Sequence, residues 1–332
     1  LLTCIQLAAR DQARLLAVVL AAGGASALLA LLQTIGDPQG ALYFYDVTNF
    51  GSAVGLFANR NHQAAFLACL IPLAFAAARL RDGNADTPGR RGRKFDPRLA
   101  GAIAATAFLV PLILVTGSRT GLLLGAVGLL SVAAVTPAGG RFLAGDGFWA
   151  TRKAKVALGV AATAALVSLT VYMQRDLAID RLIEAEAGEG MRALILPTSR
   201  DMLAAYWPWG TGAGAFREVY EAHEPTGLLR EFYMNQAHND WLDAALTGGL
   251  PGLAIAAVAI GAWLVRARQV LAGHCKDEFH ALRAAGLAVL LILALASLSD
   301  YPTRTPALAC LLALASVWAA LPTRRRPGGA VT

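Results

Sequence analysis

The stretch NQAHNDWLDAALTGGLPGLAIAAVAIGAWLV, residues 235–265, changes character within a few positions. Its first residues are polar and surround His238, and the rest is an apolar run with one carboxylate, Asp243, near its start. Hydrocarbon offers no water to hydrogen-bond polar groups, so a membrane protein places them at a water interface or in a cavity. The stretch therefore predicts that a helix enters a bilayer here, with His238 at its water-facing end.

The composition of the whole chain is that of a membrane protein. Of its 332 residues, 56% are hydrophobic and 15% are charged, whereas soluble domains average about 25% charged residues. The formal net charge is +7, but the basic residues lie in a few loops between apolar runs. Membrane topology explains this charge better than nucleic acid does, so we expect no nucleic-acid partner. The chain shows no cleavable signal pattern and begins with Leu1, which leaves room for further helices upstream.

Eight apolar stretches approach the roughly 20 residues that a helix needs to cross a bilayer. None carries a charged side chain at its centre, whereas proton-driven carriers usually keep an ionisable group at mid-membrane. The sequence therefore predicts an all-α fold, a polytopic bundle of about eight transmembrane helices, and argues against proton-coupled transport. The expected spans are residues 15–35, 63–79, 99–116, 120–136, 156–173, 242–265, 284–299 and 306–321.

Lysine and arginine are concentrated in segments that alternate with these spans. With eight spans, the basic segments and the start of the chain fall on one side, which the positive-inside rule makes the cytoplasm. These segments are residues 79–98, 137–155 and 266–283 and the C-terminal tail. The opposite side then receives residues 36–62, the turn at Ser118–Arg119, residues 174–241 and residues 300–305.

The long outer segment, residues 174–241, mixes charged residues with aromatic ones such as Trp207 and Trp209. A disordered linker would lack those aromatic residues. We therefore expect a cap of short helices on the membrane surface, on the side opposite the cytoplasm, with one helix beginning at Pro197. The chain then divides into N-terminal transmembrane helices (1–173, about five spans), the cap (174–241) and C-terminal transmembrane helices (242–332, about three spans).

Arg119 follows Ser118 in a tight turn between two apolar helices. Such turns ordinarily use Gly, Ser, Asn or Pro, and an arginine on this side opposes the positive-inside trend. One interpretation is an interfacial arginine whose charged head reaches lipid phosphates. The other is a guanidinium aimed at an anionic ligand, because its planar fork suits phosphate oxygens.

His238 also has two interpretations. Histidines at membrane interfaces are often hydrogen-bonded helix caps, whereas a neutral imidazole near pH 7 can accept a proton from an attacking hydroxyl. Asn239 and Asp240 would orient the ring, although Asp240 would equally cap the helix that follows. His62, three residues after Asn59, follows the same logic more weakly, because the preceding asparagines are typical of a helix cap.

Two other patterns do not indicate a site. The four cysteines share no CxxC spacing, so neither a metal nor a redox centre is expected; they are Cys4, Cys69, Cys275 and Cys310. The turn GTGAG at residues 210–214 lacks the Lys-Ser/Thr pair of a P-loop. We interpret it as a flexible turn.

Four segments in order carry a family resemblance: GLFANRNHQAAFLACLIPLA (55–74), VTGSRTGLLLGA (115–126), SRDMLAAYWPWGTGAGAFREVY (199–220) and QAHNDWLDAALTGGLPG (236–252). They resemble, respectively, an asparagine-rich helix start, a Ser-Arg turn, an arginine followed by tryptophan and a glycine-rich turn, and a His-Asn motif followed by a glycine pair. This order is similar to that of the O-antigen ligase and polymerase superfamily of bacterial envelope proteins. The resemblance covers well over half of the chain.

The resemblance implies a multi-pass glycosyltransferase of the GT-C type in the bacterial inner membrane, acting on the periplasmic side without a cofactor or metal. Its donor would be a glycan on undecaprenyl diphosphate. Arg119 and Arg200 match the arginines expected to hold the donor diphosphate, and His238 matches the histidine expected to activate the acceptor hydroxyl for an inverting attack. The residues expected to support them are Ser118, Asn59, His62, Asn239 and Asp240.

The motifs leave the acceptor open. It would be lipid A core for a ligase, another glycan for a polymerase, or a protein hydroxyl for a protein O-oligosaccharyltransferase, and we favour the first two. The alternative from another class is a polytopic transporter or scaffold of envelope polysaccharide export. The uncharged span centres argue against ion-coupled transport, whereas polar clusters on one outer face favour chemistry at the membrane surface.

Overall fold

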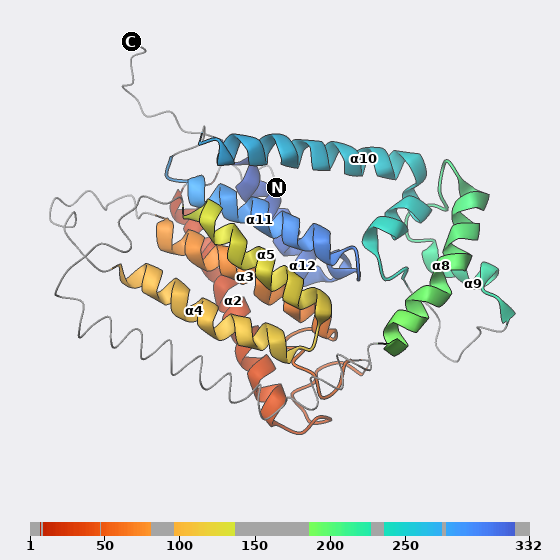
Figure 1. Cartoon of the computed structure of the whole chain (residues 1–332), viewed down its shortest axis with the longest axis horizontal. Coiled ribbons are helices and arrows are strands. Elements are labelled where there is room, and N and C mark those ends of the chain that lie inside the picture. Colours follow the sequence, from red (N-terminus) through yellow and green to blue (C-terminus); the bar gives the residue numbers. More distant parts are fainter. Residues whose placement is uncertain are drawn as a thin grey trace, which may run out of the picture.

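The computed structural model describes residue 7 and residues 9–46, 48–80, 96–136, 186–226, 236–273 and 277–322, and these residues form helices and connecting turns without a strand (Figure 1). The all-α class predicted from the sequence is confirmed. The elements are α2 (Ala9–Ile35), α3 (Arg60–Arg79), α4 (Pro97–Val115), α5 (Arg119–Val135), α8 (Glu186–Tyr206), α9 (Phe216–His223), α10 (Asp240–Leu271), α11 (His280–Ala296), the 3₁₀ helix η3 (Pro302–Arg304) and α12 (Pro306–Ala320).

Seven of the expected spans coincide with helices, namely α2, α3, α4, α5, α10, α11 and α12. Four of them are long and apolar enough to cross a membrane: Asp11–Ile35, Arg60–Arg79, Pro97–Val115 and Asp240–Leu271. Helices α5, α11 and α12 are apolar but shorter. The remaining expected span, residues 156–173, lies outside the described residues, so the total of about eight spans stays a prediction.

Helix α3 lies at the centre of the bundle and contacts α2, α4, α5 and α11. Small residues allow close contacts between helices of the bundle. A Cβ atom at Gly128 of α5 would lie 2.8 Å from the Ala68 carbonyl oxygen of α3, and one at Gly286 of α11 would lie 2.7 Å from the Ala315 carbonyl oxygen of α12. Glycine at such positions lets two helix backbones approach, which is how helices associate tightly in lipid.

Helix α10 is bent at Gly249, whose φ is 54° and ψ is −149°. Glycine reaches this region readily because it has no Cβ, and a Cβ here would collide with the Pro208 carbonyl oxygen. The expected span at residues 242–265 thus coincides with α10, and the bend inside it was not predicted. Beyond the bend, α10 continues from Leu250 to Leu271 along the edge of the bundle (Figure 1).

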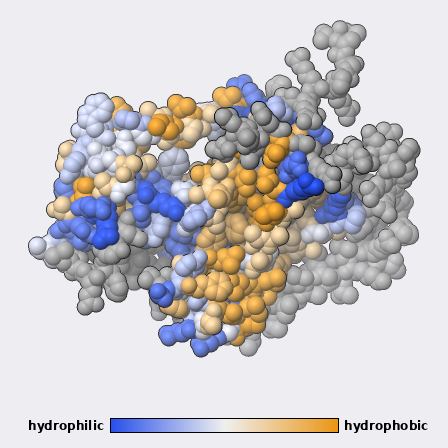
Figure 2. Space-filling view, turned by 180° about the vertical axis from the view of Figure 1, so that it is seen from behind, coloured by the Kyte–Doolittle hydropathy of each residue, from blue (hydrophilic) through white to orange (hydrophobic). Residues whose placement is uncertain are grey.

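Helices α8 and α9 lie at one end of the bundle, beside the bend of α10 (Figure 1). They share a small core of Met202, Phe216 and Tyr220 with Ala237 and Leu246. On the face seen in Figure 2, hydrophobic residues gather over the middle of the bundle, and hydrophilic residues are concentrated at the end that holds α8 and α9. A helical unit within residues 174–241 is therefore present, and its periplasmic location stays a prediction.

The expectation that a helix begins at Pro197 is wrong, because α8 runs from Glu186 through Pro197 to Tyr206. A proline inside a helix removes one backbone hydrogen bond. The turn that follows is nevertheless held by packing, since Thr198, Ser199 and Met202 are all buried.

Candidate functional site

Asp300 is the centre of a polar cluster at the end of the bundle where α3 begins and α11 ends. Its side chain is only 3% exposed. Its Oδ2 accepts hydrogen bonds of 2.9 Å from the Nδ2 atoms of Asn59 and Asn61. Its Oδ1 lies 3.7 Å from Nε2 of His62 and 3.6 Å from Nδ1 of His238. Three segments that are far apart in the sequence therefore meet on one carboxylate.

The neighbours of Asp300 keep it ionised. Burial by itself would raise its pKa, but the His238 ring, the His62 ring and the Asn61 amide together lower the pKa well below its ordinary value of 3.8. A buried charge is tolerated only where donors or opposite charges surround it. The site therefore carries a fixed negative charge at neutral pH.

Tyr301 places its ring against both imidazoles. The ring centroids are 5.0 Å apart for His238 and Tyr301 and 5.3 Å apart for His62 and Tyr301, with steep interplanar angles in both pairs. Such edge contacts are a favoured arrangement for aromatic rings. Burial and the charge of Asp300 raise the pKa of Tyr301, so its hydroxyl stays protonated.

His238 has an unusual backbone. Among the described residues it is the one non-glycine position with a positive φ, 50°. A conformation of this kind costs on the order of 1–3 kcal/mol and persists where the surroundings impose it, as they often do at functional sites. Its side chain is 29% exposed. Nδ1 is the ring nitrogen that faces Asp300.

Asn239, not Asp240 and not His238, caps α10. Its Oδ1 accepts hydrogen bonds of 3.0 Å from the backbone N–H groups of Trp241 and Leu242. Its Nδ2 donates a 3.0 Å hydrogen bond to the Leu298 carbonyl oxygen. The interpretation of His238 as a helix cap is therefore wrong, and so is that of Asp240.

Asp240 fastens the start of α10 to the segment that carries Asp300. Its Oδ2 accepts hydrogen bonds from Ser297 at 2.9 Å and Thr303 at 2.7 Å. Nε of Arg304 lies 3.3 Å from Oδ1 of Asp240, and its Nη2 lies 2.7 Å from Oδ1 of the buried Asp243. Asn239 and Asp240 were expected to orient the His238 ring directly. The contacts of that ring are instead with Asp300 and Tyr301.

Asn59 and His62, both expected as supporting residues, lie in the cluster. Asn59 caps α3, since its Oδ1 accepts a 2.8 Å hydrogen bond from the Asn61 backbone N–H while its Nδ2 donates to Asp300. His62 lies in the first turn of α3 with its side chain 4% exposed. Asn59 therefore caps α3, and His62 does not. The buried His62 ring contacts Asp300 instead.

Ser118 caps α5, because its Oγ accepts a 2.9 Å hydrogen bond from the Gly121 backbone N–H. Arg119 is the first residue of α5 and is exposed. The next residue, Thr120, lies within 2.9 Å of Ser299, hydroxyl to hydroxyl. The turn that carries Arg119 is therefore tied to the segment that carries Asp300.

Arg200 is exposed on α8. Its helix is joined to the cluster by packing, since the buried Met202 contacts the same small core as Ala237, the residue before His238. The structure thus gathers Asn59, His62 and His238 on Asp300 and places Arg119 and Arg200 on elements attached to that cluster.

Sequence reasoning missed Asp300 and Tyr301. The segment 300–305 was assigned to the same side as the histidines, but no residue in it was singled out. The signal was present, because SDYPTR at residues 299–304 puts a lone carboxylate between two apolar spans. A charge beside a span is costly unless it has a partner.

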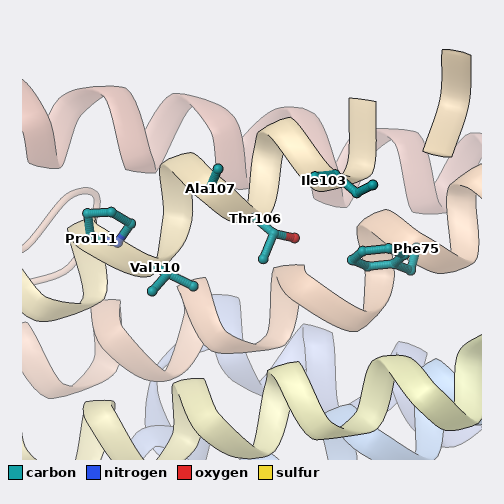
Figure 3. A pocket seen from close by; sticks show the side chains of 6 residues that line it. All are labelled: Phe75, Ile103, Thr106, Ala107, Val110 and Pro111. Carbon is teal, nitrogen blue, oxygen red and sulfur yellow. The ribbon is translucent and has the colours of Figure 1, made fainter. Parts of the chain in front are cut away.

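Two apolar hollows lie away from this cluster. One, of about 390 Å³, runs along α4 and is lined by Phe75, Ile103, Thr106, Ala107, Val110 and Pro111 (Figure 3). The other, of about 270 Å³, lies among α2, α3 and α4. Within the described part of the chain, no group of three or more His, Cys, Asp or Glu side chains is arranged to hold a metal ion.

A family model described as O-Antigen ligase matches residues 104–257. The matched segment contains Ser118, Arg119, Arg200 and His238 and ends before Asp300. The search of curated proteins finds no significant match.

Proposed function

We propose that this chain, of which residues 104–257 match a family model described as O-Antigen ligase, is a membrane glycosyltransferase of the ligase or polymerase type. In this proposal it moves a glycan from undecaprenyl diphosphate to a hydroxyl acceptor on the periplasmic side of the inner membrane. His238 acts as the base, and Arg119 and Arg200 hold the donor diphosphate.

One observation carries the proposal: the accessible imidazole of His238 lies with Nδ1 3.6 Å from the buried carboxylate of Asp300. A carboxylate on one ring nitrogen fixes the tautomer and stabilises the imidazolium that forms when the other nitrogen takes a proton. Separations in unliganded enzymes are often longer than a hydrogen bond and shorten when substrate binds.

In the proposed reaction, Nε2 of His238 takes the proton of the acceptor hydroxyl. The acceptor oxygen forms a bond to the anomeric carbon of the donor from the face opposite the diphosphate, which inverts the configuration. The bond between that carbon and the diphosphate oxygen breaks, and its electron pair leaves with the polyprenyl diphosphate. The proton remains on His238 beside Asp300 until water removes it.

The leaving diphosphate gains negative charge as this bond breaks. Fixed cations aimed at that charge lower the barrier, and guanidinium groups contact phosphate oxygens in pairs. Arg119 and Arg200 are exposed on elements attached to the Asp300 cluster. This placement supports their proposed role without a metal.

Three acceptors fit this chemistry: lipid A core, another glycan and a protein hydroxyl. We favour the first two because the motifs resemble ligases and polymerases. A transporter or scaffold of polysaccharide export is the alternative from another class. A strained, accessible histidine paired with a buried carboxylate supports catalysis over that alternative.

The test is His238→Ala in cells that make the lipid-linked glycan. Loss of a general base typically lowers the rate by about 10²–10⁴-fold, so transfer should fall to background while the donor accumulates on the periplasmic side. The measurements are the profile of transferred glycan and the amount of lipid-linked donor accessible from the periplasm.

The matched control is His223→Ala on α9, where the ring contacts the Val219 carbonyl oxygen and Tyr206. This variant should keep near-normal transfer. Accumulation of donor on the cytoplasmic side in the His238→Ala strain would support the transporter instead, and a normal glycan profile would remove His238 from catalysis.

A further inference from the structure

Two large aromatic side chains are exposed in the loop between α8 and α9. Trp209 is 75% exposed and Trp207 is 50% exposed, whereas Trp318 in the bundle is fully buried. Leaving this much aromatic surface in water forgoes a large hydrophobic stabilisation. A cluster of this kind indicates a surface that another phase or partner covers.

Backbone hydrogen bonds fix this loop to the bend of α10. The Pro208 carbonyl oxygen accepts a 2.7 Å bond from the Leu250 N–H, and the Thr211 N–H donates a 2.9 Å bond to the Leu246 carbonyl oxygen. A Cβ at Gly210 would lie 2.6 Å from the Gly249 backbone nitrogen, so the two glycines allow this approach. The tryptophans are thus held in a fixed position beside the bend of α10.

The apolar surface of α10 that would face lipid begins at this bend. Leu250 is 53% exposed, and Ile255 and Val258 further along the same helix are each 73% exposed. Apolar side chains exposed along a membrane helix face hydrocarbon. The exposed tryptophans therefore adjoin the first residue of an apolar surface that is continuous with lipid.

We infer that Trp207 and Trp209 form an interfacial anchor, which inserts among the phospholipid head groups at the outer end of α10. Tryptophan is enriched at this level because its ring is apolar and its N–H is polar. The loop 207–214 contains no charged residue, and the hydroxyl of Thr211, its one polar side chain apart from the indole N–H groups, is buried. A sugar-binding surface would need polar side chains beside the aromatic rings, so the lipid interface is the better fit.

The anchor would set the depth of α8, and hence of Arg200, relative to the bilayer. It rests on the membrane location of the chain and not on glycan transfer. Its test therefore measures depth directly and gives a result even if the proposed reaction is wrong.

The experiment uses full-length protein without its four cysteines, in vesicles of phosphatidylethanolamine and phosphatidylglycerol. Nitroxide labels are attached to cysteines introduced as Trp207→Cys and Trp209→Cys. Glu221→Cys on α9 serves as the water-exposed control and Val258→Cys as the hydrocarbon control. The ratio of oxygen to nickel-chelate accessibility, measured by paramagnetic resonance, reports depth.

The ratio at positions 207 and 209 should be several-fold higher than at 221 and lower than at 258. A ratio equal to that at 221 would overturn the anchor and leave glycan stacking as the use of the loop. A second measurement keeps the native cysteines: phospholipids brominated near the head group should quench a component of the tryptophan fluorescence. The Trp207→Ser/Trp209→Ser variant should lack that component, and unchanged quenching in this variant would also overturn the anchor.

Discussion

Each end of α11 has a buried charge, and the two are used differently. Near its start, the fully buried Arg283 pairs with Asp277 and donates to the carbonyl oxygens of Leu321 and Pro322 after α12. Just beyond its end, Asp300 is nearly as buried, but the His238 ring beside it is 29% exposed. Arg283 in the first network is shielded from solvent, whereas the second network includes a histidine that solvent can reach.

This difference is the one expected between a network that stabilises the fold and a site of the proposed reaction. Cations near helix C-termini satisfy the last carbonyl groups and favour the folded state. The Asp300 cluster instead combines an ionised carboxylate with an accessible imidazole and a strained backbone. A strained backbone costs free energy and persists only where the surrounding structure imposes it, as it often does at functional sites. We therefore expect mutations at the two ends to separate folding from activity.

The largest effect is expected for Arg283→Ala. Removing one partner of a buried ion pair leaves the other uncompensated and typically costs about 3–5 kcal/mol of folding free energy. The amount of folded protein extracted in detergent and its thermal midpoint should both fall, and transfer should fall only in proportion to folded protein. Arg268→Ala, at an exposed arginine on α10, is the control and should change neither. Normal stability in Arg283→Ala would contradict a structural role for this end.

Asp300→Asn should lower transfer by roughly tenfold to a hundredfold, because a small misplacement of a catalytic group has costs of this size. The amide would also turn an NH₂ group toward donors such as Asn59 and Asn61, which now bond to the carboxylate. Initial rates at saturating acceptor measure the effect. Full activity in a folded variant would show that Asp300 does not position His238.

The same variant tests the charge of Asp300 through pH. Because the folded pKa of Asp300 lies below its ordinary value, its stabilisation is complete above the unfolded pKa and is lost as pH falls toward the folded one. The difference in thermal midpoint between wild type and Asp300→Asn should shrink as the pH falls below about 4. A difference that stays constant or grows below about pH 4 would contradict the lowered pKa.

Arg119→Lys is expected to have the smallest of these effects, about a tenfold loss of transfer. An ammonium keeps the charge but cannot make the forked contact of a guanidinium with phosphate. The apparent KM for lipid-linked donor and the maximal rate measure the loss. Arg217→Lys is the control, since Arg217 is an exposed arginine paired with Glu221 on α9. Equal activity of both variants would favour an arginine that only reaches lipid phosphates.

The sequence predicted most of the helices, because an apolar run of sufficient length has few alternatives to a membrane helix. It did not predict the bend of α10, although Gly248, Gly249 and Pro251 marked the position. A hydropathy pattern cannot tell a glycine that only lowers helix propensity from one that adopts φ 54° against the Pro208 carbonyl group. That distinction depends on a contact with a loop about forty residues away.

The candidate site was predicted in part for a similar reason. Charge counting placed the polar clusters on one side, and the structure joins Asn59, His62 and His238 there. Which helix ends meet around a bundle depends on packing, which a single sequence does not reveal. Asp300 was therefore overlooked, although its segment was expected on the same side of the membrane as the segments that carry Asn59, His62 and His238.

The shared carboxylate also has a consequence for biosynthesis. The cluster needs the start of α3, His238 just before α10 and the turn before α12, which are far apart in the sequence. During translation the cluster is completed only after residue 300 has left the ribosome and the earlier helices have been inserted. Until then, a nascent chain in the translocon lacks the carboxylate beside which His238 lies.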